Sequence, residues 1–128
     1  MATFKPKIMI VDDEADARTA LARTLSSKGY EVLEVGEGKP VLSLAKNLWP
    51  SLIVLDIVLP DISGVEVLKQ LRADPIAKAI PVLLLTAKPD VVEQLGTLKE
   101  KSDEYFEKPG RIEDLLSTIQ RMVTSKKS

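Results

Sequence analysis

The spacing of hydrophobic positions changes repeatedly along this chain, and the changes predict its elements. Runs rich in Ile, Val and Leu that are too short to cross a membrane are typical of strands buried on both faces of a parallel sheet. Between the runs, apolar residues recur at spacings of three and four, as on a helix with one buried face. The predicted strands are residues 7–11, 31–35, 51–59, 80–85 and 105–107.

Capping signals mark where the first three predicted helices begin and end. The acidic run 12–14 suits the positive end of the first helix, and Gly29 follows that helix as a stop. Pro40 falls in the first turn of the second helix. Ser63 and Glu66 form a capping box that opens the third.

Two further helices complete the pattern. One is predicted beyond Asp90 and is weakened by Gly96, whereas the last is the clearest, with one apolar face along 112–123. Five strands and five helices then alternate with short connections. Right-handed crossovers make this an α/β fold of three layers, a parallel sheet with helices on both faces. We expect a single domain, residues 1–128, with its core at about 6–123 and a polar tail at 124–128.

The amino-acid composition limits which metal sites and which kinds of catalysis this chain can have. The 128 residues are 45% hydrophobic and 29% charged, as in ordinary globular proteins, and the net charge of −1 gives no electrostatic reason to expect nucleic-acid binding. The N-terminus lacks the features of a signal peptide, so a cytoplasmic location is expected. The chain has no Cys and no His, which excludes disulfides, thiolate or His-ligated metal sites and Ser-His-Asp catalysis. Any metal is therefore bound by oxygen, with Mg²⁺ the leading candidate.

Polar residues stand at the carboxyl ends of four predicted strands: Asp12, Asp13, Asp56, Thr86 and Lys108. In a parallel sheet these ends meet at one edge, which is where ligands bind. Three carboxylates and one ammonium sum to a charge of about −2, and like charges near 4 Å repel by about 4 kcal/mol at an effective dielectric of about 20. The cluster therefore favours a divalent cation.

Asp56 is a candidate nucleophile toward phosphorus, because carboxylates form covalent aspartyl phosphates. The metal and Lys108 would neutralise charge on the phosphoryl oxygens, and Thr86 would offer a hydroxyl donor. Each residue alone has an ordinary explanation as a cap or a solvated charge. Their occurrence in order, one strand end after another, favours a joint site.

These residues lie in motifs that resemble a known family. The segments IMIVDDE, LDIVLPDISGVEVLKQLR, LLLTA and DEYFEKP are similar to those of the receiver domain of bacterial two-component response regulators, of the single-domain chemotaxis extent. The resemblance covers essentially the whole chain. It implies a flavodoxin-like (βα)5 fold with strand order 2-1-3-4-5. It also implies that Asp56 accepts a phosphoryl group from a histidine kinase or a His-phosphotransfer protein in a Mg²⁺-dependent reaction.

The resemblance assigns roles to the residues around the acceptor. Asp13 would bind Mg²⁺ directly and Asp12 through water, with Asp56 and the backbone carbonyl of Val58 as the other protein ligands. Lys108 would bind the phosphoryl group, and the Lys-Pro peptide after it is usually cis in this family.

A switch is implied as well. Thr86 would bind the phosphoryl group and act with Tyr105 to change the face formed by the fourth predicted helix, the fifth strand and the last helix. That face would bind an unknown downstream protein and is also where a homodimer would form. No nucleic acid or membrane partner is expected for the chain by itself.

Several positions depart from the family pattern. Gly110 stands where a large apolar residue commonly follows Lys-Pro, Lys101 and Ser102 replace a frequent Gly-Ala, and Pro89 stiffens a loop. These departures bear on the output face rather than on phosphorylation. Val58 and Lys88 lie two residues beyond the acceptor and the switch Thr, where access of hydrolytic water is governed. Val58 cannot orient that water, so slow self-dephosphorylation is expected.

Other functions remain as alternatives. An aspartyl-nucleophile phosphatase of the dehalogenase type would need a D-x-D segment, but Ile57 and Val58 follow Asp56. A receiver-like module that signals without phosphorylation would not need the full acidic and switch set. A flavin binder would need more than 4% aromatic residues. We therefore expect a signalling receiver that catalyses only its own phosphorylation and slow autodephosphorylation, rather than an enzyme.

Overall fold

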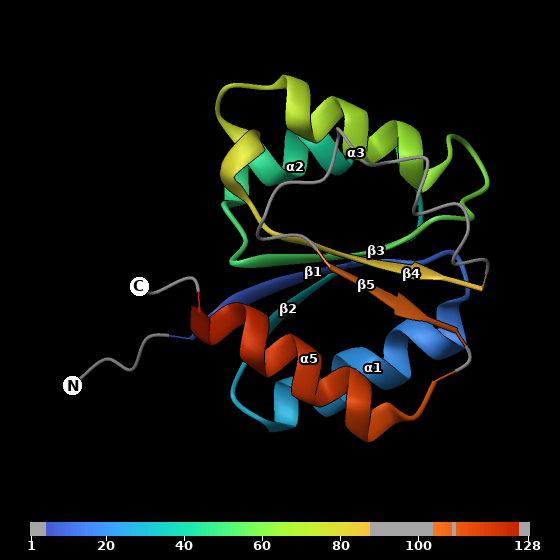
Figure 1. Ribbon diagram of the computed structural model, residues 1–128, viewed down its shortest axis with the longest axis vertical. Coiled ribbons are helices and arrows are strands. Elements are labelled where there is room, and N and C mark those ends of the chain that lie inside the picture. Colours follow the sequence, from blue (N-terminus) through green and yellow to red (C-terminus); the bar gives the residue numbers. More distant parts are fainter. Residues whose placement is uncertain (1–4, 88–103, 109, 126–128) are drawn as a thin grey trace.

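The computed structural model describes residues 5–87, 104–108 and 110–125 (Figure 1). Its strands are β1 (Lys7–Val11), β2 (Glu31–Val35), β3 (Leu52–Asp56), β4 (Val82–Thr86) and β5 (Glu104–Glu107). Its helices are α1 (Ala15–Ser27), α2 (Val41–Leu48), α3 (Gly64–Ala73) and α5 (Ile112–Ser125), with a 3₁₀ turn η1 (Ala77–Ala79). All strand pairs are parallel and the order is β2-β1-β3-β4-β5, which confirms the predicted topology.

The sheet divides the core into two apolar clusters, one on each face. Helices α2 and α3 cover one face and α1 and α5 cover the other (Figure 1). Every residue of β3 and β4 is buried, as the apolar runs predicted, whereas the edge strands β2 and β5 are partly exposed. In the described part of the chain, no helix combines the length and the apolar character needed to span a membrane.

Several element ends differ from the prediction, and β5 begins at Glu104 rather than at Tyr105. The strand predicted at 51–59 ends at Asp56, because the Ile57 carbonyl instead accepts a 2.7 Å hydrogen bond from the Gly64 amide and closes a loop. The strand predicted at 80–85 runs from Val82 to Thr86, after the 3₁₀ turn. The tail predicted from residue 124 is wrong by two residues, since α5 continues to Ser125.

Most caps are found as predicted. The Ser63 hydroxyl accepts from the Glu66 amide at 3.2 Å, and Gly29 has the left-handed φ of 96° that ends α1. Pro40 is the residue just before α2, which has no side-chain cap of its own. The helix predicted beyond Asp90 and the departures at 89, 101 and 102 lie outside the described residues.

Candidate functional site

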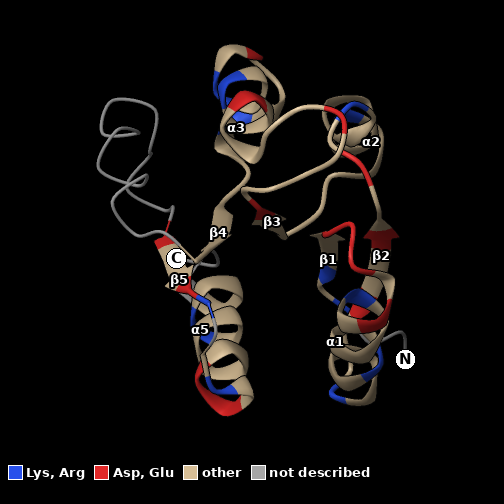
Figure 2. Ribbon diagram, turned by 90° about the vertical axis from the view of Figure 1, so that its right-hand side faces the viewer, with Lys and Arg blue, Asp and Glu red and all other residues tan. Residues whose placement is uncertain are grey.

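The carboxyl edge of the sheet brings together residues that are distant in sequence. Asp12 directly follows β1, Asp56 ends β3, Thr86 ends β4 and Lys108 follows β5. Figure 2 shows acidic segments at the end of β3 and in the turn after β1. Asp12, Asp56 and Thr86 are only 4–6% exposed. Polar side chains are therefore buried at the ends of three strands that are otherwise largely apolar.

Lys108 joins the two buried carboxylates. Its Nζ lies 2.9 Å from Asp56 Oδ2 and 4.0 Å from Asp12 Oδ2. Its backbone amide donates to the Thr86 carbonyl at 2.6 Å, which fixes the residue beside the end of β4. Burial alone would lower the pKa of the Lys108 ammonium, but the hydrogen bond and charge of Asp56 and the charge of Asp12 outweigh burial and raise that pKa. Lys108 is therefore held as a cation.

One ammonium does not balance both acids. Burial raises the pKa of the Asp12 carboxyl, and the charge of Asp56 raises it further; the Glu14 amide and Lys108 oppose the rise without cancelling it. Asp12 is thus a carboxylate whose negative charge is destabilised in its present surroundings. A further positive charge beside Asp12 and Asp56 would relieve that repulsion.

Magnesium fits this donor set. Asp12 and Asp56 supply hard oxygen ligands, and Mg²⁺ commonly binds through one or two carboxylates while keeping several waters. Asp13 is exposed at the same turn. Among the described side chains no three acidic groups form a ready-made metal cluster, so the fit rests on the two buried carboxylates and solvent. The amide of Val58 donates to Asp56 Oδ1 at 3.0 Å, which keeps the turn carrying the Val58 carbonyl beside Asp56.

Thr86 and Tyr105 lie on the same face of the sheet. Tyr105 pairs with Leu84, and Thr86 pairs with Glu107, so both lie on positions of one parity. Thr86 is buried whereas Tyr105 is 46% exposed. The two residues predicted as a switch pair therefore occupy the same face of neighbouring strands, and their role stays a prediction. Pro109, and with it the predicted cis peptide, lies outside the described residues.

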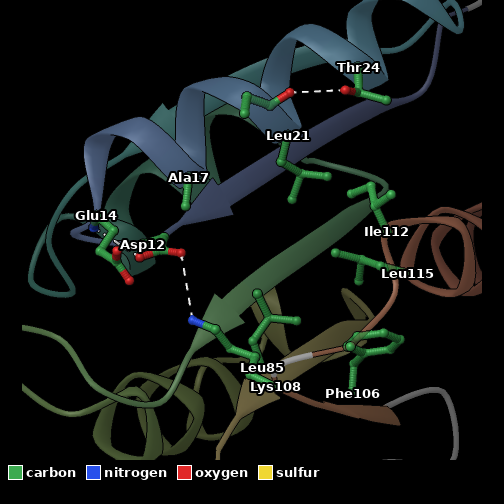
Figure 3. A pocket seen from close by; sticks show the side chains of 12 residues that line it. Asp12, Glu14, Ala17, Leu21, Thr24, Leu85, Phe106, Lys108, Ile112 and Leu115 are labelled. Atoms are coloured by element: carbon green, nitrogen blue, oxygen red, sulfur yellow. Dashed lines mark hydrogen bonds and ion pairs between the residues drawn. The ribbon is translucent and has the colours of Figure 1, made fainter.

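A cavity of about 330 Å³ adjoins the acidic cluster, between α1 and the beginning of α5 (Figure 3). Asp12 and Lys108 lie at one end, and the other walls are mostly apolar: Ala17, Ala20, Leu21, Leu85, Phe106, Ile112 and Leu115. Gly110 also lines it, and a Cβ there would come within 2.3 Å of the Phe106 ring. Sequence reasoning missed this cavity, although the unusual Gly110 was a signal for it.

Three further residues shape the site, although no role was predicted for them from the sequence: Gly64, Asp61 and Arg18. A Cβ on Gly64 would lie 2.3 Å from the Asp56 carbonyl oxygen. Asp61 accepts from the Gly38 and Lys39 amides at 2.8 and 2.7 Å. Arg18 donates to the Asp12 carbonyl at 2.7 Å. All three act through contacts between separate segments, which no local pattern reports.

Known proteins share the sequence pattern. Residues 8–120 match the profile of the response regulator receiver domain. The DNA-binding response regulator MtrA of Mycobacterium tuberculosis (strain ATCC 25618 / H37Rv) is 32% identical over 120 residues, covering 94% of this chain and 51% of MtrA. Response regulator MprA of Mycobacterium sp. (strain KMS) is 36% identical over 117 residues, covering 91% and 50%. The chain spans about half the length of these curated relatives.

Solved structures share the fold. The chemotaxis response regulator CheY4 of Vibrio cholerae has a TM-score of 0.83 at 29% identity, covering 93% of this chain and 99% of that one. Response regulator protein TrrA of Thermotoga maritima, solved in complex with Mg²⁺-BeF, has a TM-score of 0.78 at 29% identity, covering 91% and 98%. Profile, sheet order and a buried carboxylate cluster at the sheet edge agree: the chain belongs to the response regulator receiver domain family of two-component signalling, whose general function is Mg²⁺-dependent phosphorylation on Asp.

Proposed function

We propose that Asp56 is the phosphoacceptor of this receiver and that a histidine kinase or a His-phosphotransfer protein is the donor. The observation that carries the proposal is the environment of its carboxylate. Asp56 is buried at the end of β3, with Oδ1 bonded to the Val58 amide at 3.0 Å and Oδ2 to Lys108 at 2.9 Å. These bonds hold the carboxylate in one orientation, and orientation is most of what phosphoryl transfer requires of a protein.

In the proposed reaction an Asp56 oxygen attacks the phosphorus of a phosphohistidine. The new O–P bond forms as the P–N bond breaks, and the electron pair of that bond returns to the imidazole nitrogen. Lys108 is placed to move from the carboxylate to an oxygen of the arriving phosphoryl group, where its charge is stabilising. The Thr86 hydroxyl, at the end of the neighbouring strand, is the proposed second donor.

Asp13 and Asp56 would hold Mg²⁺ directly together with the Val58 carbonyl, and Asp12 would act on it through water. When bound, Mg²⁺ neutralises negative charge that develops on the transferring oxygens. The destabilised charge of Asp12 supports this assignment, because a cation beside that carboxylate would restore its usual acidity.

The proposed output is a shift between two conformations of the face that includes β5 and α5, together with the predicted helix beyond Asp90. A phosphoryl group biases this equilibrium only through its different affinity for the two states. Converting a ratio of roughly 1:99 to 99:1 takes about 5.5 kcal/mol of differential binding. Thr86 and Tyr105 are the proposed links, since both occupy the same face of neighbouring strands.

The remaining assignments complete the proposal. The domain acts in the cytoplasm on an unidentified protein target, with a homodimer through the same face as one mode of output. It catalyses only its own phosphorylation and slow dephosphorylation. Residues 1–128 form one domain, and this domain does not itself bind nucleic acid.

Replacing Asp56 by Asn tests the proposal. The substitution keeps the shape of the side chain but removes the nucleophilic carboxylate. We expect incorporation of phosphate from a panel of histidine kinases to be lost in Asp56→Asn, with the circular dichroism spectrum unchanged. Asp114→Asn, on the exposed surface of α5, is the matched control and should be phosphorylated like the unmodified protein. Mg²⁺-dependent modification that persists in Asp56→Asn would place the acceptor elsewhere.

A further inference from the structure

We propose that Arg18 is a positioning residue that fixes the peptide between Asp12 and Asp13 for magnesium binding. The inference rests on the proposed role of these two acids as metal ligands. It concerns a side chain of α1 that lies outside the carboxylate cluster itself.

Arg18 bridges two segments. Its Nη1 donates to the main-chain carbonyl of Asp12 at 2.7 Å, and its Nε donates to Glu34 Oε1 of β2 at 3.1 Å. The side chain of Arg18 is 18% exposed, so most of its surface is covered by neighbouring residues. The planar guanidinium can make both bonds at once in a fixed geometry, which an ammonium on a flexible chain does not reproduce.

Neighbouring residues keep the guanidinium in place. The Thr19 hydroxyl donates to the same Glu34 oxygen at 3.0 Å, so the acceptor of Arg18 is itself held. Gly36 leaves room for the guanidinium, because a Cβ there would lie 3.2 Å from Arg18 Nη1. Helix α1, strand β2 and the turn after β1 are therefore connected through one side chain.

The bond to Arg18 completes the restraint on the Asp12 turn. The Asp12 amide donates to the Val35 carbonyl at 3.0 Å, and the Glu14 amide donates to Asp12 Oδ1 at 2.9 Å. The Asp12 carbonyl, which belongs to the peptide that leads into Asp13, is held by Arg18. Fixing that peptide plane restrains the backbone from which both acidic side chains extend. Groups that orient metal ligands in this way typically contribute about 10–100-fold to affinity or activity.

A metal-free measurement is the first test. In Arg18→Ala, the amide of Glu14 should exchange with solvent faster than in the unmodified protein, because the turn loses one of its restraints. The amide of Val58, which bonds to Asp56 on the other loop, should be unaffected. Arg23→Ala removes the same residue type from the exposed side of the same helix and is the matched control.

Magnesium titration is the second test, followed through amide chemical shifts without any phosphodonor. We expect the Kd for Mg²⁺ to rise about tenfold or more in Arg18→Ala. Arg18→Lys should recover only part of the loss, and Arg23→Ala should bind like the unmodified protein. A Kd within twofold of the control, with unchanged exchange at Glu14, would overturn the proposal.

Milder variants keep the proposal testable if Arg18→Ala does not fold. Arg18→Gln keeps a shorter polar side chain and Glu34→Gln keeps the shape of the acid, and each removes the ion pair. The same weakening of Mg²⁺ binding is expected, to a smaller degree, and its absence in both variants contradicts the role of Arg18. Failure of the unmodified protein to bind Mg²⁺ at all would instead contradict the proposed function.

Discussion

At the scale of a single residue, we expect Val58 to influence the lifetime of the phosphorylated state. Its amide bonds to Asp56 Oδ1, yet its side chain is 75% exposed and apolar. Water that attacks the acyl phosphate would therefore pass a residue that cannot orient it. In Val58→Asn an amide could hold that water, and one hydrogen bond worth about 0.5–1.5 kcal/mol corresponds to roughly a tenfold faster loss of phosphate at the upper end.

The lifetime of the phosphorylated protein, measured after removal of the donor, checks this prediction. Val58→Ala is the control, since it changes size at the same exposed position without adding a polar group. A lifetime in Val58→Asn that is unchanged or longer would refute the idea that the apolar residue slows hydrolysis.

Gly64 and Gly29 both resist substitution, but for different reasons: one is steric and the other conformational. Gly64 begins α3, and a Cβ there would lie 2.3 Å from the Asp56 carbonyl oxygen and 2.7 Å from Ile57 Cα, both main-chain atoms. Gly29 has open space but a φ of 96°. We expect Gly64→Ala to lower the free energy of unfolding by about 1–3 kcal/mol through overpacking, and Gly29→Ala by about 1–2 kcal/mol through backbone strain.

The two substitutions disturb different parts of the molecule. Urea denaturation gives both free energies, and phosphorylation distinguishes the variants, because only the change at Gly64 displaces the loop that carries the acceptor. We expect slower phosphorylation in folded Gly64→Ala and a normal rate in Gly29→Ala. Equal rates in the two variants would mean that the close approach of α3 to Asp56 has no functional consequence.

At the scale of an element, the turn that leads into helix α2 is held by a residue distant in sequence. Pro40, which precedes α2, makes no side-chain cap bond, and the carboxylate of Asp61 accepts from the amides of Gly38 and Lys39 in that turn. Asp61 lies in the loop between β3 and α3, so these bonds tie the loop after Asp56 to the turn before α2. A carboxylate at this end of a helix is favourable because it faces the positive end of the helix dipole.

The pKa of Asp61 predicts an acid-sensitive contribution. Desolvation opposes ionisation, but the backbone amides together, led by those of Gly38 and Lys39, outweigh it and lower the pKa of this carboxyl from 3.8 to about 2. A lowered folded-state pKa means that the stabilisation is present above about pH 4 and is lost as pH falls toward about 2. Asp61→Ala should therefore lower the thermal midpoint at neutral pH, and the difference from the unmodified protein should shrink below pH 4.

Thermal unfolding between pH 2 and 7 measures this difference. Glu37→Gln is the control, since Glu37 is an exposed acid in the adjacent turn. Asp61→Asn keeps one acceptor oxygen and should fall between Asp61→Ala and the unmodified protein. A difference between Asp61→Ala and the unmodified protein that is constant across this pH range would show that the carboxylate charge does not support α2.

Comparison with the sequence shows that element centres are easier to predict than element ends. The apolar composition of β1, β3 and β4 indicates that these strands are buried on both faces. A cap such as Ser63 lies next to the helix that it begins. By contrast, β3 ends early because of a bond from Gly64, and the turn before α2 is held by Asp61. These contacts depend on packing that single-segment patterns do not contain.

The candidate site follows the same division. Asp12, Asp56, Thr86 and Lys108 were predictable because strand ends of a parallel sheet converge on one edge. The residues that hold these side chains in place were not predictable. Arg18, for example, extends from α1 and bonds both to Glu34 of β2 and to the Asp12 carbonyl. Strand order and spacing specify which residues meet, whereas the exact restraint on each depends on three-dimensional neighbours.

At the scale of the whole molecule, the site draws on four of the five strands. Asp12, Asp56, Thr86 and Lys108 follow or end β1, β3, β4 and β5, whose apolar residues fill the core on both faces of the sheet. The structure that binds a ligand here is thus the folded sheet, and the unfolded chain has no equivalent site. A ligand that binds only the folded state raises its stability according to concentration and affinity.

Mg²⁺ with beryllium fluoride, a mimic of the phosphoryl group, should therefore stabilise the entire domain. At a concentration one hundred times Kd the gain is about 2.7 kcal/mol, which corresponds to roughly a 10 °C rise in Tm for a domain of this size. Asp56→Asn should abolish the rise, because the carboxylate that binds beryllium is gone, and Mg²⁺ alone should give a smaller shift than the pair. Calorimetry across ligand concentrations measures these shifts. An equal rise in Asp56→Asn would mean that the mimic binds away from the carboxyl edge of the sheet, since the fold is otherwise the same in both proteins.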